Sequence, residues 1–281
     1  MINETLDALL ISQTRKPDEI VIVNGGGKNN SKNYLEKWRS HFFNLKIIDT
    51  KNINLAVSRN IGLPYCKGDL VLQTDDDARP LPDWIEKLEK THTKYLNAGV
   101  IGGDVIDGGG SFLSRVADAA TFPHHTKIQK VHNVPGVNSS YKKEVIQQVG
   151  EYDISLFRGE DVDYNWRAKK KGWDVLYIPD IKVLHVHRPT WAGLFKQHYM
   201  YGRAYFLVRN KWNDMYSHYP KKVDSMKSFT KWLGSWFWIP WLDAFQKTRK
   251  MKSQITGIEF IILGLINYSN RIGTFVQKYF H

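Results

Sequence analysis

Short apolar runs alternate with amphipathic stretches along roughly the first hundred residues of the chain. Runs rich in Val, Ile and Leu predict buried strands at 19–23, 46–49, 69–73 and 99–103. Apolar residues at helical spacing predict helices that end near Leu10, cover 34–43 and 54–63, and begin again at Pro82. Because strands and helices alternate, the fold class expected is α/β, with a mostly parallel sheet flanked by helices.

The pattern is less regular after residue 104. A flexible loop is expected at 108–110, and helices are expected at 144–149 and 160–171, ended by Gly150 and Gly172. Two further strands are predicted at 175–178 and 181–186. From Trp191 onward aromatic residues and lysines dominate, and we expect a helical extension there.

Composition narrows the class of protein. The 281 residues are 42% hydrophobic and 13% aromatic, which is enough to build a core and excludes wholesale disorder. The single cysteine, Cys66, excludes a disulfide framework and a Cys-rich zinc module. Met1 to Leu10 carries Glu4 and Asp7 and does not resemble a signal peptide, and no apolar run approaches the ~20 residues that span a bilayer. The expected location is therefore cytoplasmic.

Charge is unevenly distributed along the chain. The formal net charge is +12, yet residues 189–281 alone hold 14 basic and 4 acidic side chains, together with six of the ten tryptophans. The preceding residues are close to neutral. Such an asymmetry predicts a polyanionic partner for the C-terminal part, either an anionic membrane or a nucleic acid.

Three adjacent carboxylates, Asp75, Asp76 and Asp77, follow the strand expected at 69–73. In an extended segment alternate residues share a face, so Asp75 and Asp77 would point the same way. Two carboxylates on one side suit a hard divalent ion such as Mg²⁺ or Mn²⁺, which would then bind phosphate oxygens. The alternative is a solvated acidic turn.

Three other clusters are chemical candidates. Glu160 and Asp161 lie at the start of a predicted helix. A carboxylate at this position is suited to act as a general base. The alternative interpretation is that these residues only cap the helix. His185 and His187 would share one side of a strand as metal ligands, or be ordinary strand histidines. The glycine tract after Asn24 would admit a phosphate or ribose, or form a plain turn.

In order and spacing these pieces resemble the inverting glycosyltransferases of family 2, which have the GT-A fold. The resemblance covers about residues 3–190. Three segments carry it: "SQTRKPDEIVIVNGG", "NLAVSRNIGLPYCKGDLVLQTDDDARPLPDWIEKL" and "VPGVNSSYKKEVIQQVGEYDISLFRGEDVDYNWRAKKKGWDVLYIPDIKVLHVH". The resemblance implies transfer of a sugar from a nucleotide-diphosphate donor to a hydroxyl of a glycan or lipid-linked acceptor, with a divalent metal.

Site residues follow from the same resemblance. Asp75 and Asp77 match the family's Asp-x-Asp pair, with Asp77 as the main metal ligand. His185 matches a histidine that completes the metal shell, and His187 is the lesser candidate. Arg59 matches a donor-side arginine that contacts phosphate or helps to hold Asp75.

Asp161 matches the family's catalytic base, and Glu160 matches the neighbouring carboxylate that binds acceptor or donor sugar. Asp76 belongs to the same donor-binding segment as the Asp-x-Asp pair. A base on the face opposite the leaving diphosphate gives in-line displacement with inversion.

The chain departs from the family in two places. Asn3 to Leu6 already match residues that follow the family's first strand, so that strand is expected to be missing. Asn24 stands where the family commonly has an Asp that reads the nucleotide base. Two rival functions stay open: a catalytically impaired nucleotide-sugar binder, and a basic nucleic-acid-binding protein.

The expected organisation is a transferase domain over 1–190 and a basic, Trp-rich, membrane-associating extension over 191–281. The segment "WLGSWFWIPWLDAFQKTRKMK" contains Trp232, Trp236, Phe237, Trp238 and Trp241, followed by four basic residues at 247, 249, 250 and 252. Tryptophan favours the membrane interface, and each basic residue near an anionic leaflet adds about 1 kcal/mol of attraction. We expect peripheral association with the inner face of the cell membrane, and no binding of nucleic acid. The alternative is a helical subdomain that buries its tryptophans.

Overall fold

The computed structural model describes residues 1–26, 35, 37–39, 42, 44–187, 190–215, 225–250 and 257–280, with the backbone alone at 228, 232, 249 and 250. The helix expected over 34–43 lies mostly outside the described residues. Gly27, Lys252 and the side chains of Trp232, Arg249 and Lys250 lie outside them as well.

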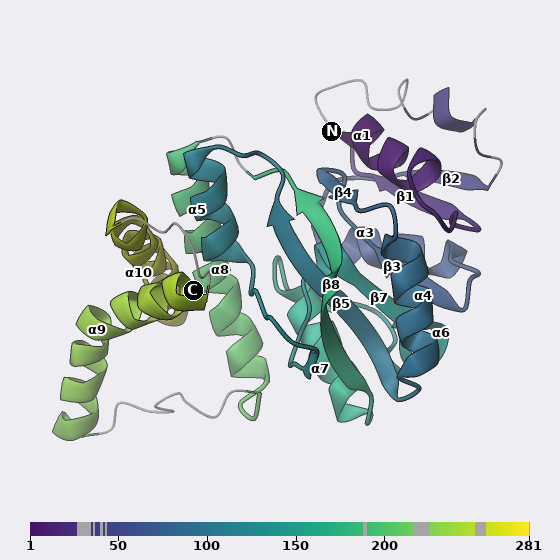
Figure 1. The fold of residues 1–281 in the computed structure, drawn as a ribbon. Coiled ribbons are helices and arrows are strands. Elements are labelled where there is room, and N and C mark those ends of the chain that lie inside the picture. The colour runs from purple at the N-terminus through teal and green to yellow at the C-terminus, as the bar shows by residue number, and fades with distance from the viewer. Residues whose placement is uncertain are drawn as a thin grey trace. The chain divides into compact units, whose positions relative to one another are not determined.

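The chain divides into two compact units (Figure 1). The first, called here the sheet unit, consists of Met1–Ile106 and Thr126–His185. The second, called the helical unit, consists of Asp107–His125 and Val186–His281. Residues 107–125 thus group with the C-terminal helices, although the sequence resemblance runs through them.

The sheet unit contains two separate β-sheets. A two-stranded sheet is formed by β1 (Ile20–Asn24) and β2 (Leu45–Asp49), which run parallel. The larger sheet has the order β3-β7-β5-β8-β4, and β6 pairs with β8. Its strands are β3 (Leu70–Gln73), β4 (Ala78–Pro80), β5 (Ala98–Asp107), β6 (Gln129–Lys130), β7 (Ser139–Lys142) and β8 (Asp174–His185).

The parallel pairing expected from the sequence is present between β1 and β2, whereas four pairs of the larger sheet run antiparallel. In the larger sheet β3 with β7, β5 with β7, β4 with β8 and β6 with β8 are all antiparallel. The antiparallel strand β7 was not predicted, because the short polar segment Ser139–Lys142 has little apolar character. The two strands predicted at 175–178 and 181–186 are one continuous strand, β8, which runs through Pro179 and Asp180.

Helices of the sheet unit start at residues whose chemistry favours a helix start. Asn54 caps α3 by accepting a hydrogen bond from the amide of Val57 at 2.9 Å. Three acidic residues in the first turn of α7 complement its dipole. The helices of this unit are α1 (Ile2–Leu6), α3 (Leu55–Gly62), α4 (Trp84–Lys94), α6 (Lys143–Val149) and α7 (Glu160–Lys170).

A pocket of about 670 Å³ is lined by residues of both β1 and β3. Val21 and Val23 contribute from β1, and Leu70 and Leu72 from β3. Each of these strands is at the edge of its own sheet, and their side chains are half-buried rather than buried as the apolar runs predict.

An aromatic core lies beneath the N-terminal half of α7. Tyr152 stacks on Tyr164 with 4.0 Å between ring centroids, and Tyr141 meets the Tyr164 ring edge-on at 5.5 Å. All three rings are nearly or fully buried. This packing fixes the start of α7, which carries Glu160 and Asp161.

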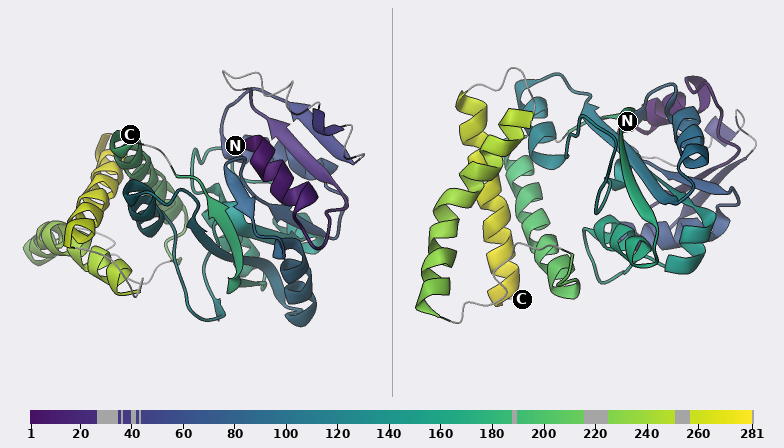
Figure 2. Two further views of the ribbon diagram at one scale, coloured as in Figure 1. Left: turned by 45° about the horizontal axis from the view of Figure 1, so that its top comes forward. Right: turned by 60° about the horizontal axis from the view of Figure 1, so that its bottom comes forward.

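The helical unit contains α5 (Phe112–Thr121), α8 (Trp191–Lys211), α9 (Met226–Lys250) and α10 (Gly257–Phe280). Gly202 and Gly273 allow close packing of α8 against α10, since a Cβ on either residue would collide with backbone of the other helix (Figure 2). Helix α5 was not predicted, and its Ser111 caps the amide of Ser114 at 3.0 Å. None of the helices within the described part of the chain combines the length and apolar character needed to cross a bilayer.

Candidate active site

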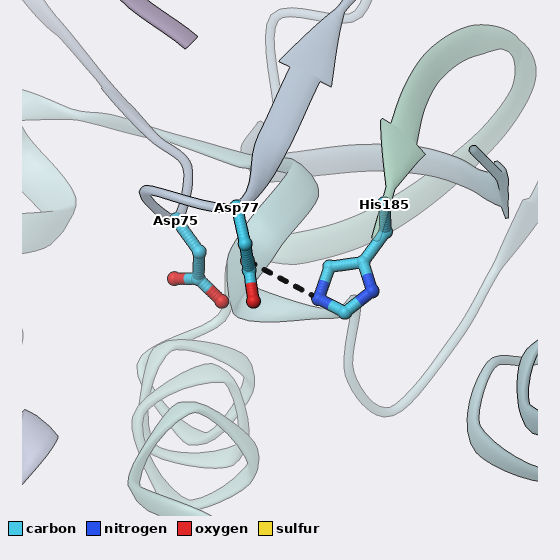
Figure 3. A group of neighbouring side chains, drawn as sticks. All are labelled: Asp75, Asp77 and His185. Atoms are coloured by element: carbon cyan, nitrogen blue, oxygen red, sulfur yellow. Dashed lines mark ion pairs between the residues drawn. The ribbon is translucent and has the colours of Figure 1, made fainter. Parts of the chain in front are cut away.

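Two carboxylates and one imidazole meet beside β4 and β8. Asp77 directly precedes β4, whose first residue pairs with His185 at the end of β8. Nε2 of His185 lies 3.4 Å from Oδ1 of Asp77, and Asp75 extends from the preceding turn toward the same point (Figure 3). One ligand atom from each of the three side chains lies within 4.8 Å of the others. The structure therefore brings together the three residues that the sequence selected as metal ligands.

A turn, rather than an extended segment, places Asp75 and Asp77 next to each other. The amide of Ala78 donates to the carbonyl oxygen of Asp75 at 3.2 Å. Asp76 is exposed at this turn, and its own carbonyl accepts a hydrogen bond from the Thr5 hydroxyl at 2.9 Å. The extended conformation expected for 75–77 is therefore wrong. The expectation that Asp75 and Asp77 point toward the same place is nevertheless met, because the turn brings them together.

The electrostatics of this group fit a divalent cation. Burial raises the pKa of the Asp75 carboxyl above its usual range, and the neighbouring Asp77 carboxylate raises it further, while Arg59 opposes both effects. Two carboxylates held this close repel each other unless a cation lies between them. Carboxylate oxygens with an imidazole nitrogen form a donor set that suits such an ion.

Glu160 is the first residue of α7, and its carboxylate forms a buried ion pair with Arg59 of α3. The two side chains are only 4% and 12% exposed. Burial raises the pKa of Glu160 and repulsion from Asp161 adds to this, whereas Arg59 lowers it. Removing either partner would leave an uncompensated buried charge, which is strongly destabilising.

Arg59 lies between the two acidic clusters. Burial by itself would lower the pKa of its guanidinium, but attraction to Glu160 raises it above its usual value. Asp161 and Asp75 contribute to the same attraction. The sequence places Arg59 on the donor side alone, whereas the structure makes it the cation shared by both clusters.

The Asp161 carboxylate is oriented by two backbone amides. Its Oδ2 accepts from the amide of Gly136 at 3.0 Å, and its Oδ1 accepts from the amide of Val162 at 2.8 Å. Gly159, with φ of 76°, sets the entry to α7. The N-cap of α7 is Gly159 and makes no side-chain hydrogen bond, so Asp161 orients itself on an amide of the first turn without capping the helix. Asp161 as a residue is only partly buried.

Three residues near Asp161 were not singled out from the sequence. Gln73 donates from Nε2 to the carbonyl oxygen of Gly136 at 3.0 Å, and its Oε1 accepts from the Tyr152 hydroxyl at 3.1 Å. The Tyr152 ring also lies 5.4 Å from the guanidinium of Arg59. Each belongs to a segment that carries the family resemblance, but no local pattern distinguishes it.

We expect Gly136→Ala to damage the site without unfolding the protein. A Cβ at this position would lie 2.6 Å from Nη2 of Arg59 and 3.2 Å from Oδ2 of Asp161, so both side chains must shift. A displacement of about 1 Å costs about 10²-fold in turnover. Steady-state transfer rates and the melting temperature test this. Gly234→Ala is the control, because a Cβ there meets no atom within 4 Å. Equal turnover in the two variants would contradict the prediction.

Asn24 and His187 have partners of their own. Nδ2 of Asn24 donates to Asp49 at 2.8 Å, at the paired ends of β1 and β2. Nε2 of His187 lies 3.4 Å from Asp118, within the helical unit. Asp49 is a further carboxylate at the strand ends that sequence reasoning did not identify.

Residues 1–150 match the family model described as Glycosyl transferase family 2. Among curated proteins, the chain is 24% identical over 194 residues to Glycosyltransferase AglE of Haloferax volcanii, covering 68% of this chain and 63% of that protein. It is 29% identical over 176 residues to the Glucosyl-dolichyl phosphate glucuronosyltransferase of the same organism, covering 57% of this chain and 53% of the relative. The chain thus spans less than two thirds of the length of either relative.

Among solved structures, the chain is similar to the mannosyltransferase PcManGT from Pyrobaculum calidifontis, solved with GDP-Man and Mn²⁺. The TM-score is 0.66 at 14% identity, and the match covers 99% of this chain and 83% of the other. GalNAc-T7, solved with UDP, GalNAc and Mn²⁺, gives a TM-score of 0.55 at 15% identity over 82% of this chain and 52% of the other. The likeness confirms the α/β GT-A fold with a C-terminal helical region.

Proposed function

Because the chain belongs to glycosyl transferase family 2, we propose that it moves a sugar from a nucleotide-diphosphate donor to a hydroxyl of a glycan or lipid-linked acceptor. The observation that carries this proposal is the pair of acidic clusters that share Arg59. One has the donor set of a divalent-cation site, and the other presents a carboxylate oriented by a backbone amide on a partly exposed residue.

In this proposal Asp75, Asp77 and His185 hold Mn²⁺ or Mg²⁺. The metal, when bound, neutralises the charge that develops on the leaving diphosphate. Burial raises the pKa of Asp75, and the positive charge of Arg59 opposes this by favouring the ionised carboxylate. The ion pair with Glu160 holds Arg59 in place between the two acidic clusters. Glu160 therefore acts mainly as a positioning residue for Arg59.

Asp161 is the proposed general base. Its carboxylate takes the proton of the acceptor hydroxyl while that oxygen bonds to the anomeric carbon, and the bond from this carbon to the diphosphate oxygen breaks. Attack from the side opposite the leaving group inverts the anomeric configuration. The amides of Gly136 and Val162 orient the carboxylate for this step.

Donor recognition is proposed to involve Asn24, Arg59 and Asp76 in addition to the metal ligands. Asn24 acts together with Asp49, since the two side chains are hydrogen-bonded at the ends of β1 and β2. Asp76 is exposed and available to a donor at the same turn that holds Asp75 and Asp77.

A thermal-shift screen of nucleotide sugars with and without Mn²⁺ tests this function. We expect at least one nucleotide sugar to raise the melting temperature only when Mn²⁺ is present, because the diphosphate and the carboxylates repel each other without it. A tenfold excess over Kd stabilises by about 1.4 kcal/mol, which is a measurable shift. No shift with any nucleotide sugar would contradict donor binding.

We place the protein in the cytoplasm, peripherally associated with the inner face of the cell membrane, and expect no nucleic-acid partner. The excess of basic residues lies within residues 189–281 of the sequence, and the residues before them are close to neutral. Similarity to a relative named for a dolichyl-phosphate-linked substrate supports a lipid-linked acceptor.

A second candidate is a catalytically impaired nucleotide-sugar binder. The specific observation in its favour is the divided sheet, since the pocket between β1 and β3 reaches Thr74 and Asp75 next to the proposed metal site. A thermal shift without transfer to any acceptor tested, in a protein with intact Asp161, would favour this candidate over the enzyme.

A further inference from the structure

Helix α9 exposes large apolar side chains along much of its length. Phe237 is 65% exposed and Trp238 is 71% exposed. Others at helical spacing are also exposed: Met226, Leu233, Leu242 and Phe245. A soluble helix normally buries such residues, so a contiguous apolar surface of this kind marks an interaction site.

The tryptophan-rich segment is divided between an inner and an outer set. Trp236 packs edge-on against Phe275 at 5.7 Å, and Trp241 lies 5.5 Å from Phe260. These inner rings bind α9 to α10, as the helical-subdomain alternative requires. Phe237 and Trp238 point outward, so that alternative accounts for only part of the segment.

Helix α10 carries a second exposed apolar stripe. Ile258, Ile261, Leu265, Ile272 and Tyr279 recur at intervals of three, four and seven residues, and each is about half-exposed or more. This spacing places them on one side of the helix. The other side, which includes Leu263 and Ile266, is buried.

The surrounding charge indicates what covers these apolar faces. Residues 189–281 have ten more basic than acidic side chains, and Lys227, Lys231 and Lys278 are exposed on the two helices themselves. Two copies of such a surface would repel each other, whereas an anionic lipid surface attracts it. Lys247 is not part of this surface, because its Nζ donates to the carbonyl oxygen of Ala120 at 2.7 Å.

We propose that the outer faces of α9 and α10 insert into the interface of an anionic lipid bilayer, with each helix lying along the membrane. The occupant of these faces is the membrane itself and not a second copy of the chain. This deepens the proposed function by naming the surface through which the protein reaches a lipid-linked acceptor. Only the link to a lipid-linked acceptor rests on the proposed function. Binding to the bilayer can be tested separately, since it needs neither a donor nor turnover.

Flotation of the full chain with vesicles tests the proposal. We expect binding to vesicles of phosphatidylcholine with phosphatidylglycerol, and at least about tenfold less to phosphatidylcholine alone. The double variant Phe237→Ser/Trp238→Ser, and separately Ile261→Ser/Leu265→Ser, should each lower binding by at least about tenfold, because several buried CH₂ groups are lost. The matched control is Leu96→Ser/Ile154→Ser, which removes two exposed apolar side chains from the sheet unit.

Circular dichroism and the melting temperature establish that each variant is folded. Brominated lipids should quench the wild-type tryptophan fluorescence more than that of Trp238→Phe, which locates the ring in the bilayer. Unchanged flotation of both helix variants would overturn the proposal. It would also be overturned if the variants abolished a concentration-dependent dimer in sedimentation while vesicle binding stayed unchanged.

Discussion

Asp161→Asn is expected to lower the transfer rate by about 10²–10⁴-fold, the range for loss of a general base. The amide has nearly the shape of the carboxylate but cannot take a proton from the acceptor hydroxyl. The oxygen of the amide can still accept a hydrogen bond from the backbone amide of Gly136 or of Val162, so the start of α7 should be retained. Steady-state rates with saturating donor measure the effect.

A measurement of donor binding distinguishes loss of the general base from general damage to the site in this variant. The Mn²⁺-dependent thermal shift should match that of the wild-type protein, because Asp161 is not a proposed metal ligand. Asp153→Asn is the matched control, since Asp153 also accepts a backbone hydrogen bond, from Ser155 at 2.9 Å. Retained turnover in Asp161→Asn would exclude this residue as the base.

Asp77→Asn is expected to weaken Mn²⁺ binding by more than about 100-fold. Loss of an outer-shell partner of a metal site costs 10–100-fold, and loss of a ligand costs more. In the absence of metal the same change should raise the melting temperature, because it removes a negative charge close to Asp75. Calorimetric titration with Mn²⁺ and melting curves with and without the metal test the two effects.

Asp76→Asn is the control for this change. It removes the same negative charge from the adjacent residue, whose side chain is exposed. It should leave Mn²⁺ affinity close to the wild-type value. If Asp76→Asn weakened Mn²⁺ binding as much as Asp77→Asn, the assignment of ligands within the triplet would be wrong.

Local elements were predicted well where the signal is local. The apolar runs that predict strands at 19–23, 46–49 and 69–73 match β1, β2 and β3 to within one residue at either end, and Asn54 begins α3 as a cap. Strand β7 and helix α5 were missed. β7 is only four residues long and largely polar. The antiparallel pairs of the larger sheet were not predicted, because alternation of strands and helices does not specify which neighbours a strand pairs with.

Part of the candidate site was visible in the chain and part was not. The acidic triplet, the Glu160–Asp161 pair and His185 carry their own chemistry in the sequence. Gly136 and Gln73 do not, since a glycine amide and a glutamine side chain acquire their importance from Asp161 and from each other.

The sequence by itself determined the chemical groups, the family and most local elements, because these depend on residue type and short-range spacing. Only the tertiary structure decided that the pairing of Ala78 with His185 closes the proposed metal site, and that Arg59 binds Glu160 between the two acidic clusters. It also decided which aromatic side chains of α9 are buried against α10 and which are exposed. These outcomes depend on long-range packing, in which residues far apart in the chain compete for the same partners, and no local pattern records that competition.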